Sequence, residues 1–158
     1  MKPSNTPAAT RRVIELGSYW PYQLTVLADR ISRHTAGIVK QYGQLNLSQW
    51  RVMAAIAEQP GRTAAEVVTI TPMDKGIVSR ATKALLAAGL VRREGSKGDG
   101  RVSHLFLTGP GETLYQSLMP RVEAVSREIH AALSDEEQQR FGALLGRLVA
   151  TMSDPTGP

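Results

Sequence analysis

The amino-acid sequence predicts a mainly α-helical fold with one small β-hairpin, an α+β arrangement in which the hairpin interrupts a series of helices. Apolar residues make up 42% of the 158 residues but aromatic residues only 5%, a balance that suits helices packed through Leu, Val, Ile and Ala. Within residues 62–108, a short helical pattern, a turn, a second helical pattern and two strand-like runs follow one another. This order predicts a winged helix-turn-helix with further helical segments on both sides, which we expect to form a dimerisation region.

Positive charge gathers in the same stretch. Residues 62–108 hold eight Lys or Arg residues and four acidic residues, so eight minus four gives four of the chain's five net positive charges. Cationic side chains that bind phosphates release condensed counterions, so concentrated charge favours a nucleic-acid partner, although an anionic membrane surface would also attract it. The basic residues are Arg62, Lys75, Arg80, Lys83, Arg92, Arg93, Lys97 and Arg101.

Composition disfavours several other classes of protein. The chain has no cysteine, which excludes disulfides, thiolate metal sites and thiol-based redox sensing within it. No apolar run approaches the length that spans a bilayer, and residues 1–12 lack the hydrophobic core of a signal peptide. We therefore expect a cytoplasmic protein with no membrane partner.

The sequence carries no pattern typical of an active site. Its three histidines, His34, His104 and His130, are scattered, and it has neither a nucleophile elbow nor a phosphate-binding loop. We expect no enzymatic activity, no catalytic residue, no metal site and no cofactor.

A long first helix is predicted over about residues 18–42. Its apolar residues step by three, four and seven positions, which places them on one face: Leu24, Leu27, Ile31 and Ile38. A second helix is predicted to follow Ser48, which has the place of an N-cap, and to end at Pro60-Gly61.

The next two predicted helices form the helix-turn-helix. Thr63 and Glu66 have the spacing of a capping box, so a short helix is expected over about residues 64–69. The following helix is expected over residues 72–88, with Thr71 as its N-cap.

Beyond this helix the pattern changes from helix to strand. Gly89 is suited to a left-handed helix C-cap. Residues 90–93 and 102–107 are strand-like, and the Gly-rich segment GSKGDG joins them. The segment is therefore expected to form a β-hairpin.

Two further helices are predicted after the hairpin. Thr108 caps the first, in which Pro120 is expected to produce a kink or a break. Ser134 and Glu137 form a capping box ahead of the second. The apolar residues of the two helices are Leu114, Leu118, Val122, Val125 and Ile129, and then Phe141, Leu144, Leu145, Leu148 and Met152.

The chain is expected to form a single domain between two tails. The amphipathic helices at both ends need another surface to cover their apolar stripes, and a second copy of the same helices would cover them, so a homodimer is expected. The expected segments are a flexible N-terminal tail (1–17), one domain (18–152) with dimerisation helices (18–46 and 109–152) around the DNA-binding region (47–108), and a C-terminal tail (153–158).

The helix over residues 72–88 has two chemically different sides. One side is apolar, and the other carries short polar and cationic residues that can bind base edges and phosphates in a major groove. Such a face can also be an ordinary solvated surface, but the capped helix before it and the basic hairpin after it favour DNA. The expected DNA-binding residues of the helix-turn-helix are Arg62, Thr63, Thr71, Lys75, Gly76, Ser79, Arg80, Thr82 and Lys83.

The hairpin tip adds Lys97, Asp99 and Arg101 to the expected DNA-binding residues. An arginine here can enter a minor groove, where narrow A·T-rich stretches concentrate negative potential. Phosphate would repel Asp99, so its expected task is to hold Arg101 or Arg80 in position. The alternative is an ordinary Asp-Gly turn that needs no DNA.

Residues 47–108 carry a series of motifs in a specific order and spacing: Leu47 to Val52, Asp74-Lys75, Val78-Ser79-Arg80, Leu85, Gly89-Leu90-Val91, Arg93, Asp99-Gly100-Arg101 and Leu107-Thr108. This series resembles the signature of the multiple antibiotic resistance regulator (MarR) family, and the resemblance extends over about residues 20–150. It implies an obligate homodimer that places a recognition helix of each subunit in successive major grooves of a palindromic operator and its wings in the flanking minor grooves. It also implies that a small ligand, often a phenolic or aromatic acid, modulates DNA affinity.

One position departs from that family's pattern. Gly76 stands where such proteins commonly carry a residue with a side chain, often Ser. A glycine at this place lets the backbone come close to DNA but removes a contact, which puts the operator sequence in doubt but not the binding mode. The absence of cysteine separates the chain from the peroxide-sensing branch of the family.

The resemblance further implies an effector crevice between the dimerisation helices and the DNA-binding region. His34 could bind a carboxylate or phenolate there, with Arg30 or Arg33 adding charge. The alternatives are a half-buried or interfacial His34 and a Trp50 that belongs to the core. The candidate lining residues are Trp20, Tyr22, Arg30, Arg33, His34, Trp50 and Met53, and they favour an aromatic acid or its acyl conjugate as effector.

The sequence therefore predicts a sequence-specific DNA-binding transcriptional regulator, acting as a ligand-responsive repressor of a catabolic, efflux or stress operon. An activator or anti-silencing factor of the same fold is an alternative, because the sign of regulation depends on where the operator lies. A winged helix that binds proteins and never DNA is another.

Overall fold

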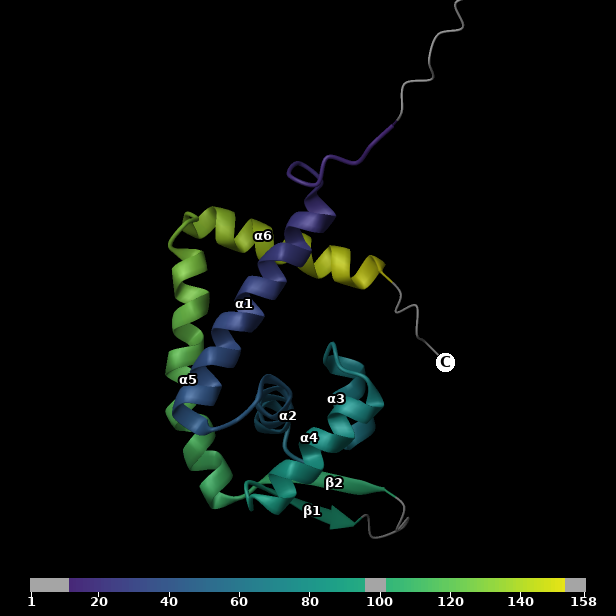
Figure 1. Cartoon of the computed structure of the whole chain (residues 1–158), viewed down its shortest axis with the longest axis vertical. Coiled ribbons are helices and arrows are strands. Elements are labelled where there is room, and N and C mark those ends of the chain that lie inside the picture. Colours follow the sequence, from purple (N-terminus) through teal and green to yellow (C-terminus); the bar gives the residue numbers. More distant parts are fainter. Residues whose placement is uncertain (1–11, 96–101, 153–158) are drawn as a thin grey trace, which may run out of the picture.

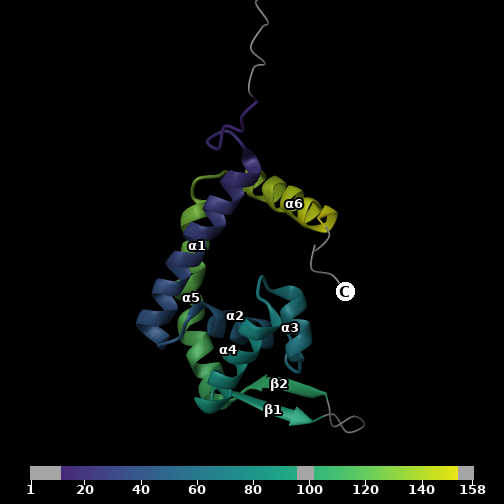
Figure 2. The same ribbon diagram turned by 45° about the vertical axis from the view of Figure 1, so that its right-hand side comes forward.

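The computed structural model describes residues 12–95 and 102–152, and within them it confirms a mainly helical fold with one β-hairpin (Figure 1). Two long helices, α1 and α5, lie side by side, α6 crosses one end of this pair, and the hairpin lies at the other end (Figures 1 and 2). The elements are α1 (Trp20–Gly43), α2 (Leu47–Glu58), α3 (Ala64–Ile70), α4 (Lys75–Ala87), β1 (Val91–Gly95), β2 (Ser103–Leu107), α5 (Gly109–His130) and α6 (Asp135–Thr151).

Three of the predicted helix starts are confirmed. Thr63 and Glu66 close the capping box of α3, Ser134 and Glu137 close that of α6, and the Thr108 hydroxyl accepts a hydrogen bond from the third residue of α5. The Thr63 amide and hydroxyl, which donate to the Glu66 carboxylate, lower the pKa of Glu66. Each cap supplies a partner for amide groups that a helix leaves unpaired.

Two predicted helix starts were wrong. Asn46, not Ser48, caps α2, because its side chain and that of Gln49 satisfy each other's backbone amides. Asp74, not Thr71, caps α4, and its Oδ1 accepts from the Ile77 amide at 2.8 Å. The Asp carboxylate at this place also faces the positive end of the helix dipole, so α4 begins later than expected.

The hydrophobic core joins the helix-turn-helix to α1 and α5. Helix α4 packs on α2 and α3, and α2 also contacts α1 and α5. The largest fully buried side chains are Met53, Ile56, Leu85, Leu105 and Leu118, which come from α2, α4, β2 and α5. Packing of this core therefore fixes the orientation of α4 relative to the long helices.

The hairpin is attached to the loop between α2 and α3. Strands β1 and β2 pair antiparallel, with Val91 opposite Leu107. The Leu105 amide donates to the Arg62 carbonyl and the Gly61 amide donates to the Leu105 carbonyl, both at 2.9 Å. His104 Nδ1 lies 2.8 Å from the Gly61 carbonyl oxygen, so this nitrogen donates. The base of the wing is therefore tied to the start of the helix-turn-helix.

A second junction connects the end of α4 to the start of α5. Gly89 has φ +69°, and the amides of Gly89 and Leu90 bond to the carbonyls of Leu86 and Leu85. This is the left-handed C-cap that the sequence predicts. The Thr108 hydroxyl then donates to the Gly89 carbonyl at 2.6 Å, and the Thr108 amide donates to the Leu90 carbonyl at 3.0 Å.

Only part of the predicted tails belongs to the described residues. Residues 1–11 and 153–158 lie outside the described residues. In the rest of the predicted N-terminal tail, the amides of Ser18 and Tyr19 bond to the Glu15 carbonyl, so a turn precedes α1. Helix α5 continues through Pro120, so the expected break is absent and the expected kink stays a prediction. In the part of the chain described, no helix has the length and apolarity needed to cross a membrane.

Gly111 should be required for the α4–α5 junction. A Cβ atom there would lie 1.9 Å from the Leu90 carbonyl oxygen, a backbone atom that cannot move aside cheaply. Gly111→Ala should therefore lower the free energy of unfolding by roughly 1–3 kcal/mol, as overpacking does, in urea titrations. The matched control is Gly109→Ala, in the same helical turn, where a Cβ would meet nothing within 4 Å. Equal stabilities of the two variants would contradict the claim that the junction requires a glycine at position 111.

Candidate nucleic-acid interface

Five of the predicted DNA-binding residues lie exposed along one side of α4. With about 100° of rotation per residue, positions that step by one, three or four stay on one side of a helix. Three of the five are cationic, and with one acidic N-cap they leave this side positively charged. The residues are Lys75, Gly76, Ser79, Arg80 and Lys83.

Thr82 was predicted among these outward-facing residues, and its expected exposure is wrong. Thr82 is 1% exposed and its Oγ1 is buried without a hydrogen-bond partner in the structure. At about 100° per residue, Thr82 lies between the buried Val78 and the exposed Lys75, on the side of α4 that faces α3. Its hydroxyl faces the protein interior and not an outside partner.

Three other predicted DNA-binding residues use their side chains inside the protein. The Arg62 side chain is only 11% exposed, and its Nη1 donates to the Ala55 carbonyl at 2.6 Å and to Glu58 at 2.5 Å. Thr63 is occupied by the capping box of α3. The Thr71 hydroxyl donates to the Val67 carbonyl at 2.6 Å. These side chains stabilise the ends of α2 and α3, and their predicted role as DNA contacts stays a prediction.

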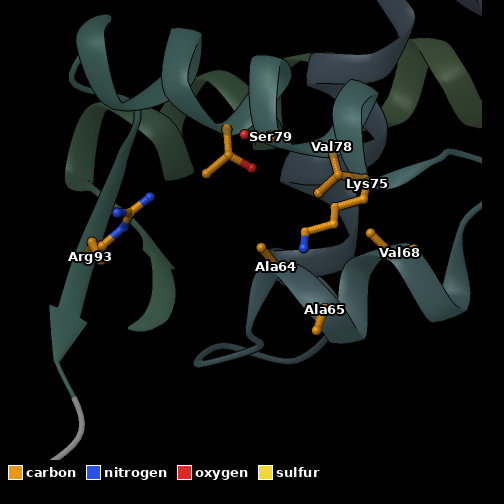
Figure 3. Close-up of a pocket in the computed structure, with 8 residues that line it drawn as sticks. Ala64, Ala65, Val68, Lys75, Val78, Ser79 and Arg93 are labelled. Atoms are coloured by element: carbon orange, nitrogen blue, oxygen red, sulfur yellow. The ribbon is translucent and has the colours of Figure 1, made fainter. Parts of the chain in front are cut away.

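A cleft of about 350 Å³ lies between α3, α4 and β1 (Figure 3). The figure shows Ala64, Ala65 and Val68 of α3 along one side and Lys75 and Ser79 of α4 along another, with Arg93 reaching toward the cleft from β1. Two cations therefore border an apolar floor next to the exposed side of α4. A phosphate backbone that passes between α4 and the wing would meet both charges.

Arg93 is a residue of this surface that the sequence-based prediction left out. Its neighbour Arg92 points the other way along the strand, where its guanidinium lies 4.6 Å from the Phe106 ring centroid and pairs with Glu94. Because side chains alternate across a strand, only one of two adjacent arginines can face α4. Alternation along residues 91–95 was the signal that could have separated them.

The predicted DNA contacts at the hairpin tip, Lys97, Asp99 and Arg101, lie outside the described residues. The two strands that lead to the tip pair as far as Gly95 and Ser103. These three residues remain predictions.

The structure does not bring the predicted effector residues together. Tyr22 and Arg30 line one cleft of about 320 Å³ at the start of α1. Trp20 and His34 are exposed on the same helix, and the exposed Arg33 pairs with Asp29 of its own helix at 2.6 Å. All five of these residues come from α1 alone.

Trp50 and Met53 belong to the core, which corrects their predicted place on a crevice wall and agrees with the alternative considered for Trp50. Met53 has no exposed surface, and Trp50 stacks on Tyr115 with ring centroids 5.2 Å apart. Burial raises the pKa of Tyr115. The stacked pair joins α2 to α5.

An apolar groove of about 430 Å³ runs between α1, α5 and α6. Leu24, Leu27 and Ile31, from the predicted apolar face of the first helix, line one wall. Phe141 and Leu145 of α6 line another, and both are more than one-third exposed. Large exposed apolar patches of this kind mark interaction surfaces.

Comparison with known proteins gives consistent matches. The sequence pattern of the MarR family matches residues 44–102. The chain is 30% identical over 125 residues to the transcriptional regulator HosA of Escherichia coli O157:H7, a match that covers 79% of this chain and 93% of that protein. It is also 30% identical over 117 residues to the homoprotocatechuate degradative operon repressor of Escherichia coli, covering 72% of this chain and 76% of that one.

A crystal structure of a MarR-family transcriptional regulator from Silicibacter pomeroyi has the same fold, with a TM-score of 0.80 and 26% identity over 93% of this chain and 100% of that chain. The helix-turn-helix, the wing and the cationic side of α4 define a winged-helix transcriptional regulator. Within this class, the chain belongs to the MarR family.

Replacing the buried hydroxyl of Thr82 tests its corrected placement. Thr82→Val keeps the side-chain shape and removes an oxygen that has no partner, so the free energy of unfolding should rise by about 1–3 kcal/mol in urea titrations. Thr69→Val, which removes an exposed hydroxyl bonded to the Ala65 carbonyl, is the control and should change stability by less than about 0.5 kcal/mol. A loss of DNA affinity in Thr82→Val would restore Thr82 as a DNA contact.

Proposed function

We propose that this MarR-family regulator binds a palindromic operator as a homodimer and represses transcription until a small ligand releases it. The observation that carries this proposal is the exposed cationic side of α4, which the core holds rigidly beside the wing. In the proposed division of the chain, residues 47–108 contact DNA and residues 18–46 and 109–152 form the dimer.

The apolar surfaces of the long helices support a homodimer. Helix α6 buries none of its residues in the single chain. Its apolar side chains are 38–46% exposed at four positions, Phe141, Leu144, Leu145 and Leu148, and they continue the wall of the apolar groove. A second copy would bury both surfaces at once, as isologous interfaces do. Twofold symmetry would then match the symmetry of a palindrome.

The position of α4 supports DNA binding through the major groove. Lys75, Arg80 and Lys83 are exposed along one side of α4. A groove about 12 Å wide admits such a helix. Arg93 from β1 and, by the sequence prediction, Arg101 from the hairpin tip would bind the adjacent backbone and minor groove.

Release by a ligand follows from linkage between two dimer geometries. A ligand that prefers the geometry in which the two α4 helices do not match successive grooves weakens DNA binding. A tenfold loss of affinity requires only about 1.4 kcal/mol of differential binding.

The effector class that we propose is an aromatic acid or its acyl conjugate. The similar repressor of a homoprotocatechuate degradative operon supports it, as do the aromatic and cationic side chains of α1, among them Tyr22 and Arg30. Thermal-shift screening with benzoates, hydroxycinnamates and their thioesters should find compounds that raise the melting temperature and lower operator affinity. Stabilisation only by non-aromatic ligands would contradict this class.

Lys83→Ala tests DNA binding by α4. Each lost phosphate contact makes the plot of log affinity against log salt shallower by about one unit of slope. For a dimer with both subunits on DNA the change is about two units. Fluorescence anisotropy between 50 and 200 mM salt, roughly the range in which such contacts dominate, measures the slope. The control is Arg127→Ala in α5, an exposed arginine that pairs with Glu123. An unchanged slope in Lys83→Ala would contradict phosphate binding at this position.

Leu145→Asp tests the proposed dimer. A charge in the apolar groove should shift the molecule to monomers in sedimentation velocity while leaving the winged helix folded, because the core contains no residue of α6. Gln139→Asp introduces the same carboxylate on the opposite side of α6 and should leave the dimer intact. A stable Leu145→Asp dimer would place the interface elsewhere.

A further inference from the structure

Gly76, the second residue of α4, lies between two charged groups. A Cβ atom on Gly76 would lie 3.2 Å from Oδ1 of Asp74 and 3.3 Å from Nη1 of Arg80. Both separations are shorter than ordinary van der Waals contacts with carbon. The Arg80 guanidinium therefore lies over the bare backbone of Gly76, on the same side as the Asp74 carboxylate.

Backbone conformation does not explain this glycine. The positive-φ glycines of the described chain are Gly61 and Gly89, and Gly76 has ordinary helical geometry that any residue can adopt. A glycine inside a helix disfavours the helix relative to alanine. At Gly37, another helical glycine, a Cβ would meet nothing within 4 Å. What Gly76 provides, and Gly37 does not, is room for a particular side chain.

The direction of helical side chains accounts for the contact. Side chains of a helix lean toward its N-terminus, so residue i+4 covers residue i. Arg80 thus extends toward the first turn of α4, where Asp74 is held in place by its bond from the Ile77 amide at 2.8 Å. The N-terminal residues of a recognition helix are the ones that contact base edges. Arg80 is therefore carried to the end of α4 that would enter the groove.

We propose that Gly76 determines operator specificity by positioning Arg80, which binds a guanine in each half-site. An arginine that donates two hydrogen bonds to O6 and N7 of guanine must hold its guanidinium in the plane of the base and at a fixed depth in the major groove. A Cβ at position 76 requires the Arg80 guanidinium to give way by a few tenths of an ångström, which changes its depth in the groove. Gly76 is a positioning residue in this account, and it makes no base contact of its own. The inference rests on the proposed function, since it concerns how the same helix selects DNA.

A binding selection from a randomised duplex library tests this role. Full-length wild type, Gly76→Ala, Arg80→Ala and the double variant are each used to select duplexes, which are then sequenced. Gly37→Ala is the matched control, because it adds the same methyl group to an exposed helical glycine of α1. Wild type and Gly37→Ala should select the same symmetric motif, with a guanine in each half-site.

Arg80→Ala should lose the preference for that guanine by about fivefold or more, the least that one bidentate pair contributes. Gly76→Ala should weaken the preference at the same base pair, by about threefold or more, and the double variant should equal Arg80→Ala. An unchanged motif in Gly76→Ala, or additive effects of the two substitutions, would overturn the inference. Failure of the wild type to select any motif would instead overturn the proposed function.

Discussion

Helices α4 and α5 meet at a close contact between Gly111 and the Leu90 carbonyl, and this contact sets how the DNA-facing helix sits on the long helices. It brings the first turn of α5 against the end of α4, and the bonds of Thr108 to Gly89 and Leu90 hold the two helices at that point. The surface expected to touch DNA and the helix expected to support the dimer therefore move as one piece. Under the proposed division of the chain, a change at α5 would reach α4 directly through this contact, as linkage between ligand and DNA requires.

The polar residues of the helix-turn-helix divide into two groups with different tasks. Arg62, Thr63 and Thr71 bind backbone or carboxylate oxygens within the protein and set the ends of α2 and α3. Lys75 and Lys83 have no such task in α4 and stay exposed. Both groups contain cationic residues, so positive charge in the sequence could not show which residues stay exposed. A cation that is neither buried nor bonded within the chain keeps its attraction for a phosphate, because it has not already lost its hydration to an internal partner.

Local signals predicted the fold well, and tertiary packing explains the errors. Capping boxes at Thr63 and Ser134, the left-handed Gly89 and the alternating strands depend on near neighbours, so the sequence predicted them correctly. Thr82 was misplaced because a rotation of about 20° around a helix separates it from Lys75, and only the packing of α3 decides which of the two is covered. The effector residues could not be predicted as a group, since five of them are spread over α1 and the other two, Trp50 and Met53, are buried in the core.

In a dimer of this chain, two rigidly held α4 helices should contact one duplex in phase. This arrangement is tested most directly by inserting base pairs at the centre of the selected palindrome and measuring affinity by fluorescence anisotropy. An insertion of about five base pairs, half a helical turn, turns one half-site to the opposite face of the duplex. If the two helices bind in phase, this insertion should reduce affinity to that of non-specific DNA, by at least about a thousandfold. Affinity unchanged by the insertion would show that the two helices bind independently, and would contradict the account.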